Sequence, residues 1–196
     1  MSDDPRPGRR LTAQSALDEL LAGNARFVDD QLTSLDHHLI LRARSIDKQE
    51  PFAAVLACAD SRIPVELIFD QTIGHIFVTR IAGNIATPEI IGSLEFAVAV
   101  LGVKTLLVLG HSSCGAVTAA MSADPVPGQI GLLFPHMRPA IEHSGGNLRE
   151  AIEANARLQS ELLRTSSPVI SGAVTAGNLS VAAAVYDLAS GRVSLL

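Results

Sequence analysis

The sequence predicts an α/β fold: a single domain with a mainly parallel central β-sheet flanked by helices, and with helical arms at its N-terminus. Two observations predict it. Uninterrupted apolar runs of strand length, at residues 53–57 and 105–109, are typical of parallel strands buried on both faces. Between and after these runs, stretches with a helical apolar period alternate with further strand patterns. The length of 196 residues suits one domain, expected over residues 11–196.

The N-terminal region predicts a tail and two helices. Residues 1–10 are rich in proline, glycine and charge, so we expect a disordered tail. Leucine and phenylalanine at helical spacing predict a helix over residues 12–27, with a break or kink at Gly23-Asn24. A second helix is expected over residues 35–46. Both helices are interpreted as arms rather than as parts of the core.

The middle of the chain alternates helices and strands. Pro64 suits the first turn of a helix that ends at Phe69, because its missing N–H would be unbonded there anyway. A strand follows over residues 75–80. The next helix, residues 88–101, has apolar side chains around nearly its whole circumference, and a helix of this kind is expected to be buried on every side.

The C-terminal part predicts helices and then a strand pair. The helices are expected over residues 115–121, 132–143 and 148–163. A strand over residues 179–188, a turn at Ser190-Gly191 and a short return strand to Leu196 are expected to complete the sheet.

Composition limits the class of function. The net charge is −5 and the isoelectric point is near 5.6, without basic clusters, which argues against a nucleic-acid partner. The N-terminus lacks the apolar core of a signal peptide, and no apolar run approaches the ~20 residues of a membrane span. A cytoplasmic protein without a membrane partner is therefore expected. The hydrophobic fraction of 47% and the mean hydropathy of +0.31 indicate an interface between subunits.

Two clusters of reactive side chains follow the two buried runs. Cys58, Asp60 and Arg62 follow the first run, and His111 and Cys114 follow the second. Because the carboxyl ends of parallel strands meet at one edge of a sheet, the two cysteines and the histidine can close a three-ligand site. Two thiolates and one imidazole suit zinc and leave a fourth position open, which is the catalytic pattern. A disulfide between the two cysteines is the alternative, and it leaves the other three residues unexplained.

In combination, Cys-x-Asp-x-Arg and His-x-x-Cys resemble the motifs of the β-class carbonic anhydrases. Further similar segments extend over nearly the whole chain, at residues 23–27, 64–69, 74–78, 82–84, 92–97, 114–117 and 186–188. The resemblance implies one Zn²⁺ per chain, with Cys58, His111 and Cys114 as its ligands. It also implies that Asp60 and Arg62 form the catalytic dyad.

The implied reaction is the hydration of CO₂. In the family, zinc-bound hydroxide attacks CO₂ and gives bicarbonate and a proton, which makes the chain a carbonate dehydratase. Asp60 would accept the hydrogen bond of the hydroxide, while Arg62 keeps that carboxylate ionised and aimed. An ordinary ion pair that caps the next helix is the other interpretation of the two residues.

The resemblance also implies a substrate pocket and a partner subunit. Gln49 and Phe77 match, by their spacing from Cys58, a glutamine and a phenylalanine of the plant-type branch, and Phe96 takes the position of a tyrosine there. Gly115 completes the predicted pocket. Gln49 can instead be a plain surface residue. In the family the glutamine and the tyrosine face the zinc of a neighbouring subunit, so a homodimer or a dimer of dimers is expected.

Arg80 matches an arginine of the bicarbonate-regulated family members. In their closed state, the aspartate that matches Asp60 becomes a fourth zinc ligand. Those members place a tryptophan beside the arginine, and this chain has no tryptophan. We therefore expect an open site, in which Asp60 does not bind the metal.

Two other functions fit the same residues. A hydrolase of carbonyl sulfide or carbon disulfide on the same scaffold would use the same attack, and a parallel assay of both substrates distinguishes it. A zinc-containing module without turnover is the second alternative, and the pair of Asp60 and Arg62 argues against it.

Overall fold

The computed structural model describes residues 11–33, 46, 48–122 and 124–196. Within them, five strands form one sheet in the order β2-β1-β3-β4-β5. The first four strands run parallel and β5 is antiparallel to β4, so the predicted mainly parallel sheet is confirmed. The strands are β1 (Ala53–Ala57), β2 (Ile76–Arg80), β3 (Thr105–His111), β4 (Ser180–Tyr186) and β5 (Val193–Leu195). The predicted tail over residues 1–10 and nearly all of the predicted helix over residues 35–46 lie outside the described residues.

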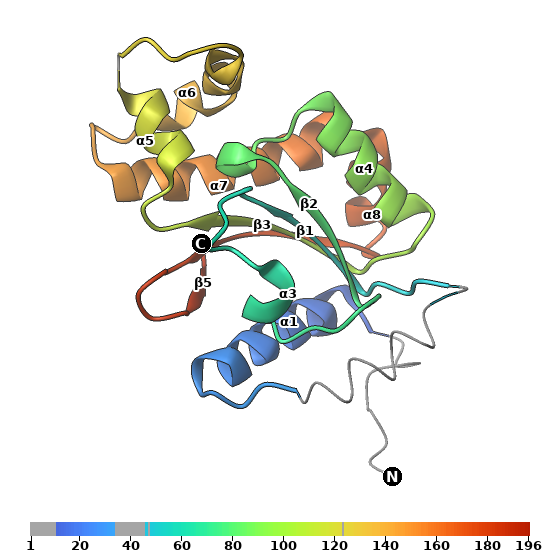
Figure 1. The fold of residues 1–196 in the computed structure, drawn as a ribbon. Helices are drawn as coiled ribbons and strands as arrows, with labels where there is room; N and C mark the ends of the chain where they lie inside the picture. The colour runs from blue at the N-terminus through green and yellow to red at the C-terminus, as the bar shows by residue number, and fades with distance from the viewer. Residues whose placement is uncertain (1–10, 34–45, 47, 123) are drawn as a thin grey trace.

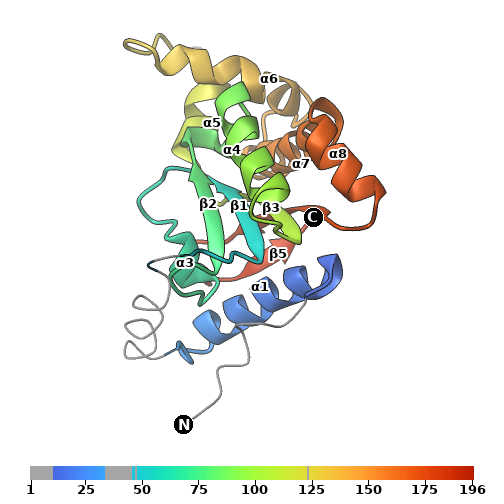
Figure 2. The same ribbon diagram turned by 90° about the vertical axis from the view of Figure 1, so that its right-hand side faces the viewer.

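Helices cover both faces of the sheet. Figures 1 and 2 show α1 and α3 on one face, and α4, α7 and α8 on the other. The helices are α1 (Ala13–Val28), α3 (Val65–Ile68), α4 (Pro88–Ala99), α5 (Gly115–Met121), α6 (Phe134–Glu142), α7 (Leu148–Ser166) and α8 (Pro168–Thr175). Two short 3₁₀ segments are η1 (Ala82–Asn84) and η2 (Ile130–Leu133). Within the described part of the chain, no helix is both long and apolar enough to cross a membrane.

Two of the predicted helices are arranged differently in the structure. The helix expected over residues 132–143 is divided into η2 and α6, and Pro64 is the N-cap of α3 rather than part of its first turn. The prediction also missed α8. Its start is marked by Ser167, whose side chain accepts the Ile170 N–H, and by Pro168 in the first helical position.

The side chains of the central strands alternate between the two layers. Leu107 and Leu109 of β3 pack in the cluster that includes α1 and α3, whereas Leu106 and Val108 pack in the cluster that includes α4, α7 and α8. Every residue of β1 and β3 is buried. This is the physical reason for the uninterrupted apolar runs in the sequence, because a strand that is covered on both faces has no solvent side.

The helix α1 is continuous and packs on the sheet, so the predicted kink and the predicted role as an arm are both wrong. Gly23 lies against the end of α3, where an added Cβ atom would stand 1.8 Å from the carbonyl oxygen of Phe69. The buried side chain of Asn24 donates to the Ile68 carbonyl (3.1 Å) and accepts the Val193 N–H (2.8 Å). Glycine and asparagine weaken an isolated helix. Here Gly23 lets α1 approach the end of α3 closely, and Asn24 binds buried backbone groups.

The helix α4 is buried on one face only. Leu94 and Ala97 are inaccessible, but Phe96 is 46% exposed. Val100, the C-cap of α4, lies one turn after Phe96 and is 65% exposed. The expectation that this helix is buried on every side is therefore wrong for the single chain. Its outer face is an apolar strip that no described residue covers.

Asp70 is a buried carboxylate that fixes the chain after α1. It accepts hydrogen bonds from Arg26 Nε (2.5 Å), from the Thr33 N–H (2.8 Å) and from Thr33 Oγ1 (2.9 Å). Burial by itself raises the pKa of Asp70, but these hydrogen bonds outweigh burial and bring the pKa below its usual value. The stabilisation is therefore present above the ordinary pKa of 3.8 and is lost as the pH falls through the lower folded-state pKa.

Asp70→Asn is expected to lower the free energy of unfolding at neutral pH by about 2 kcal/mol, because Arg26 and Thr33 lose their charged acceptor. The difference from the wild type should shrink as the pH falls well below 3.8, since the wild-type carboxylate is then protonated as well. Urea unfolding at neutral and at acidic pH measures both differences. The same difference at both pH values would contradict the assigned role of the charge.

Candidate metal centre

Three potential ligands meet at the carboxyl ends of two adjacent strands. Cys58 directly follows β1, His111 is the last residue of β3, and Cys114 is the N-cap of α5. All three side chains are buried, and their ligand atoms lie within 4.8 Å of one another. The two sulfur atoms are 4.0 Å apart and both cysteines are free, whereas a disulfide holds its sulfur atoms about 2.05 Å apart. The alternative interpretation as a disulfide is therefore wrong for this structure.

The turn between β3 and α5 returns the chain to the cluster. Ser113 adopts a left-handed backbone conformation with φ of 56°, and this turns the chain sharply so that α5 starts beside the strand end. The hydroxyl of Ser112 accepts the Leu188 N–H at 2.9 Å, which ties the turn to the segment after β4. The His-x-x-Cys spacing thus places His111 and Cys114 side by side.

The two ring nitrogens of His111 have different surroundings. Its side chain is 0% exposed, and its Nδ1 lies 3.0 Å from the carbonyl oxygen of Ser112. Because a carbonyl oxygen can only accept, Nδ1 carries the proton and Nε2 keeps a free electron pair. Nε2 is buried and has no hydrogen-bond partner among the described residues. A buried unpaired nitrogen beside two thiols fits a metal ion as the missing partner.

The two thiols interact strongly. The hydrogen bond from Cys114 lowers the pKa of Cys58, and the Gly83 N–H, 3.4 Å from Cys58 Sγ, lowers it further. The hydrogen bond with Cys58, burial and the charge of Cys58 together raise the pKa of Cys114. A divalent cation must displace the protons that the thiols still carry when it binds. Metal affinity should therefore fall in acid.

Asp60 and Arg62 form a two-pronged ion pair next to the ligands. Arg62 Nε donates to Asp60 Oδ1 (2.9 Å) and Arg62 Nη2 donates to Asp60 Oδ2 (2.7 Å). These bonds hold the pKa of Asp60 well below its usual range, so the carboxylate stays ionised. The N-cap of α3 is Pro64, without a side-chain capping bond, so the pair does not cap the next helix.

Arg80, the last residue of β2, binds the backbone of the loop that carries Cys58 and Asp60. Its Nε donates to the carbonyl of Cys58 at 3.0 Å, and its Nη2 donates to the carbonyl of Asp60 at 2.5 Å. This contact gives Arg80 a role in fixing the backbone of the loop.

The predicted pocket residues do not gather around the ligands within one chain. Gln49 is exposed and precedes β1, and Phe77 pairs with Ala54, near the opposite end of that strand from Cys58. Phe77 and Phe96 contact each other, with ring centroids 6.4 Å apart. Gly115, the first residue of α5, is exposed and directly follows a ligand. Of the four residues, Gly115 alone lies beside the candidate metal centre.

Sequence reasoning missed three residues that contact the centre or its surroundings. Gly83 of η1 donates its N–H to Cys58, and Asn155 and Gln159 of α7 bind the segment around Gly83. A signal was available, because these two amides are one turn apart on the apolar face of an amphipathic helix. Polar side chains at such positions must bind buried polar groups.

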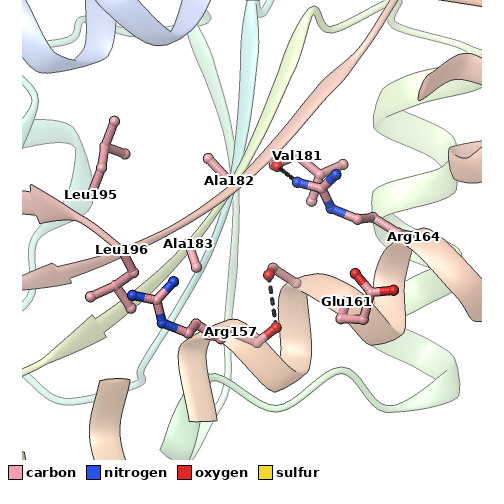
Figure 3. A pocket seen from close by; sticks show the side chains of 9 residues that line it. Arg157, Glu161, Arg164, Val181, Ala182, Ala183, Leu195 and Leu196 are labelled. Atoms are coloured by element: carbon pink, nitrogen blue, oxygen red, sulfur yellow. Dashed lines mark hydrogen bonds between the residues drawn. The ribbon is translucent and has the colours of Figure 1, made fainter. Parts of the chain in front are cut away.

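A separate pocket lies between α7 and the strands β4 and β5 (Figure 3). Arg164 reaches the carbonyl of Val181 from one side of it, and Val181 pairs with Leu106, five positions before His111 on β3. The pocket is therefore remote from the strand ends that carry the ligands.

The fold and these contacts define a class: an α/β protein with a buried Cys-His-Cys group at the carboxyl ends of parallel strands. A family model described as carbonic anhydrase matches residues 53–193. A carbonic anhydrase of Mycolicibacterium smegmatis is 37% identical over 181 residues, covering 88% of each chain. Carbonic anhydrase 2 of Mycobacterium tuberculosis is 35% identical over 197 residues, covering 94% of this chain and 92% of the relative.

Solved structures agree. A β-carbonic anhydrase of Coccomyxa has a TM-score of 0.75 and 27% identity, and the match covers 92% of this chain and 86% of that one. A tetrameric β-carbonic anhydrase of Sordaria macrospora has the same fold, with a TM-score of 0.74, 24% identity and coverage of 93% and 97%. The chain belongs to the carbonic anhydrase family, in its β class.

Proposed function

We propose that this chain catalyses the reversible hydration of CO₂ to bicarbonate and a proton, with one Zn²⁺ bound by Cys58, His111 and Cys114. The observation that carries the proposal is the convergence of two thiols with Nε2 of His111, which has no partner in the described part of the chain, beside the ionised Asp60. Buried thiolate and imidazole ligands favour zinc over the harder divalent cations. Free cysteines used as ligands also fit a reducing compartment, and the cytoplasm is the one that we propose.

The residues around the ligands have different roles in the reaction. When bound, zinc supplies a Lewis acid that lowers the pKa of a coordinated water. Asp60 accepts a hydrogen bond from the attacking water and thereby orients an electron pair toward CO₂, and Arg62 holds that carboxylate in place. Apolar side chains packed around the cysteines suit a small apolar substrate, and these are Ile85, Val117, Met137, Ala151 and Ile152.

We also propose that Asp60 stays out of the metal coordination sphere. Its two carboxylate oxygens both bind Arg62, and its Oδ1 also accepts the Arg62 N–H at 2.9 Å. Ligation by Asp60 would require these bonds to break. The chain lacks the tryptophan that accompanies the closed state in regulated family members, so the closed state has lost one contact that would offset their loss.

The test is a stopped-flow CO₂ hydration assay on purified protein, combined with metal analysis and a parallel assay of carbonyl sulfide. We expect about one zinc per chain, because the ligand set fills a single site, and rapid turnover of CO₂. Zinc-loaded protein that does not hydrate CO₂ would overturn the proposal. Faster turnover of carbonyl sulfide than of CO₂ would reassign the substrate.

We further propose that the apolar strip on α4 is covered by a second copy of the chain. Phe96 and Val100 expose large apolar surfaces, and burial of such a side chain stabilises an interface by roughly 1.5–3 kcal/mol. The family resemblance directs Gln49 and Phe96 toward a neighbouring site. Association would thus explain why these residues lie away from the ligands of their own chain.

Val100→Glu is expected to shift the protein toward monomers, because it places a charge in the apolar strip. Light scattering coupled to size-exclusion chromatography measures the change. Val169→Glu on α8 is a suitable control, since Val169 is 39% exposed but lies outside the strip. A wild-type protein that is monomeric and fully active would contradict the interface.

A further inference from the structure

Two buried amides on α7 bind the segment that follows β2. Asn155 Nδ2 donates to the carbonyl of Gly83 at 2.9 Å. Gln159 Nε2 donates to Asn155 Oδ1 at 3.0 Å, and Gln159 Oε1 accepts the Ala86 N–H at 3.0 Å. Both amide side chains are 1% exposed. The segment from Gly83 to Ala86 is therefore tied to α7 at both of its ends.

The orientation of both amides is determined by one backbone donor. The Ala86 N–H can only donate, so the oxygen of Gln159 must face it and the nitrogen must face the opposite way. That nitrogen donates to the His136 carbonyl (2.9 Å) and to Asn155 Oδ1, so Asn155 in turn directs its own nitrogen at Gly83. The hydrogen bonds therefore run in one direction, from the Ala86 N–H through Gln159 and Asn155 to the Gly83 carbonyl.

Gly83 connects these hydrogen bonds to the candidate metal centre. Its backbone has φ of 78°, and an added Cβ atom would stand 2.6 Å from Met137 Sδ. Only glycine fits this conformation and this approach without strain. Its carbonyl is bound by Asn155, and its N–H points at Cys58 Sγ, 3.4 Å away.

We propose that Asn155 and Gln159 are positioning residues that hold Gly83 with its N–H directed at the sulfur of Cys58. An N–H···S hydrogen bond withdraws charge from a ligating thiolate and fixes the direction of its electron pairs. Such outer contacts orient the ligands and tune the metal. The inference rests on the proposed function only in that Cys58 is taken as a metal ligand.

The expected effect is on the affinity for the metal, and any effect on turnover follows from it. Loss of an outer contact to a metal ligand typically weakens metal binding by 10–100-fold, and we expect about that loss in Asn155→Leu. The substitution keeps the branching of the side chain at Cγ but leaves the Gly83 carbonyl unbound. Gln159→Leu should act in the same direction, because Asn155 then loses the partner that orients it.

The experiment measures zinc affinity by competition with a chelator, and the sulfur-to-metal charge-transfer band after substitution with Co²⁺. Removal of the N–H···S bond makes the thiolate more electron-rich, so the band of Asn155→Leu should move to longer wavelength. If the leucine variant does not fold, Asn155→Ala, which leaves room for water at the Gly83 carbonyl, provides the same comparison.

A matched control separates positioning from plain stability. Asn24 is also a buried asparagine that binds backbone groups at both ends of its side chain, but it lies on α1, under the opposite face of the sheet. Asn24→Leu should lower the free energy of unfolding in urea and leave the zinc affinity and the cobalt band unchanged.

The outcomes distinguish the positioning role of Asn155 and Gln159 from the proposed function of the chain. Wild-type affinity and an unshifted band in the folded Asn155 variants would overturn the positioning role and leave the proposed function intact. Equal losses of zinc affinity in the Asn24 and Asn155 variants would also overturn it. A wild-type protein that binds no zinc at all would overturn the proposed function itself.

Discussion

Cys114→Ala is expected to remove zinc and CO₂ hydration together. The variant keeps only a thiolate and an imidazole, and two ligands cannot complete the three-ligand pattern of a catalytic zinc site. Zinc content should fall from about one per chain to near zero, and turnover should fall to the rate of the buffer. Metal analysis and stopped-flow hydration on the same sample measure both quantities. His111→Ala should behave in the same way.

His143→Ala is the matched control for the histidine variant. His143 is exposed, lies at the end of α6 and contacts the Pro139 carbonyl, so its loss should change neither the zinc content nor the turnover. Full zinc occupancy in Cys114→Ala would refute the assigned ligand set.

Asp60→Asn is expected to keep the metal and to lose turnover by about 10²–10³-fold, in the range found for removal of a single preorganised contact to a reacting group. The amide has nearly the same shape, but it lacks the charge that accepts the proton of the attacking water and binds both prongs of Arg62. Because the pKa of Asp60 lies well below its usual range, wild-type Asp60 stays ionised throughout neutral and alkaline pH. The loss in the variant should therefore be the same over that whole range.

Glu153→Gln controls for the loss of an arginine–carboxylate pair in general. Glu153 accepts from Arg149 Nε at 2.9 Å on the surface of α7, and its substitution should leave turnover unchanged. Near-wild-type turnover in Asp60→Asn would contradict the role given to that carboxylate. A crystal structure at alkaline pH with Asp60 bound to zinc would contradict the open site.

Much of the fold could be predicted because strand burial and helix period are local properties of the sequence. The apolar runs that become β1 and β3 allow no exposed face, and the amphipathic pattern of α7 specifies one helix with one buried side. The errors occurred where tertiary contact reverses a local preference. Gly23 and Asn24 predict a break by propensity, but Gly23 packs closely against Phe69 and Asn24 binds the Ile68 carbonyl within a continuous α1.

The candidate centre was predictable to the extent that its chemistry is carried by unusual residue types at strand ends. Two cysteines and a histidine in an otherwise apolar setting are conspicuous, and parallel strands bring them together. Gly83, Asn155 and Gln159 were not predictable in the same way. Their roles depend on backbone groups, and a backbone N–H has no signature in the sequence.

The sequence by itself determined the parallel sheet, the family and the residues with metal-binding chemistry, because apolar period and residue type are fixed by covalent structure. Only the tertiary structure decided that Asp60 pairs with Arg62 instead of capping α3. It also decided that, among the described residues, Nε2 of His111 has no partner and one face of α4 has no cover. These properties depend on which atoms lie within about 3 Å of one another, and such distances arise only when segments far apart in the chain pack together.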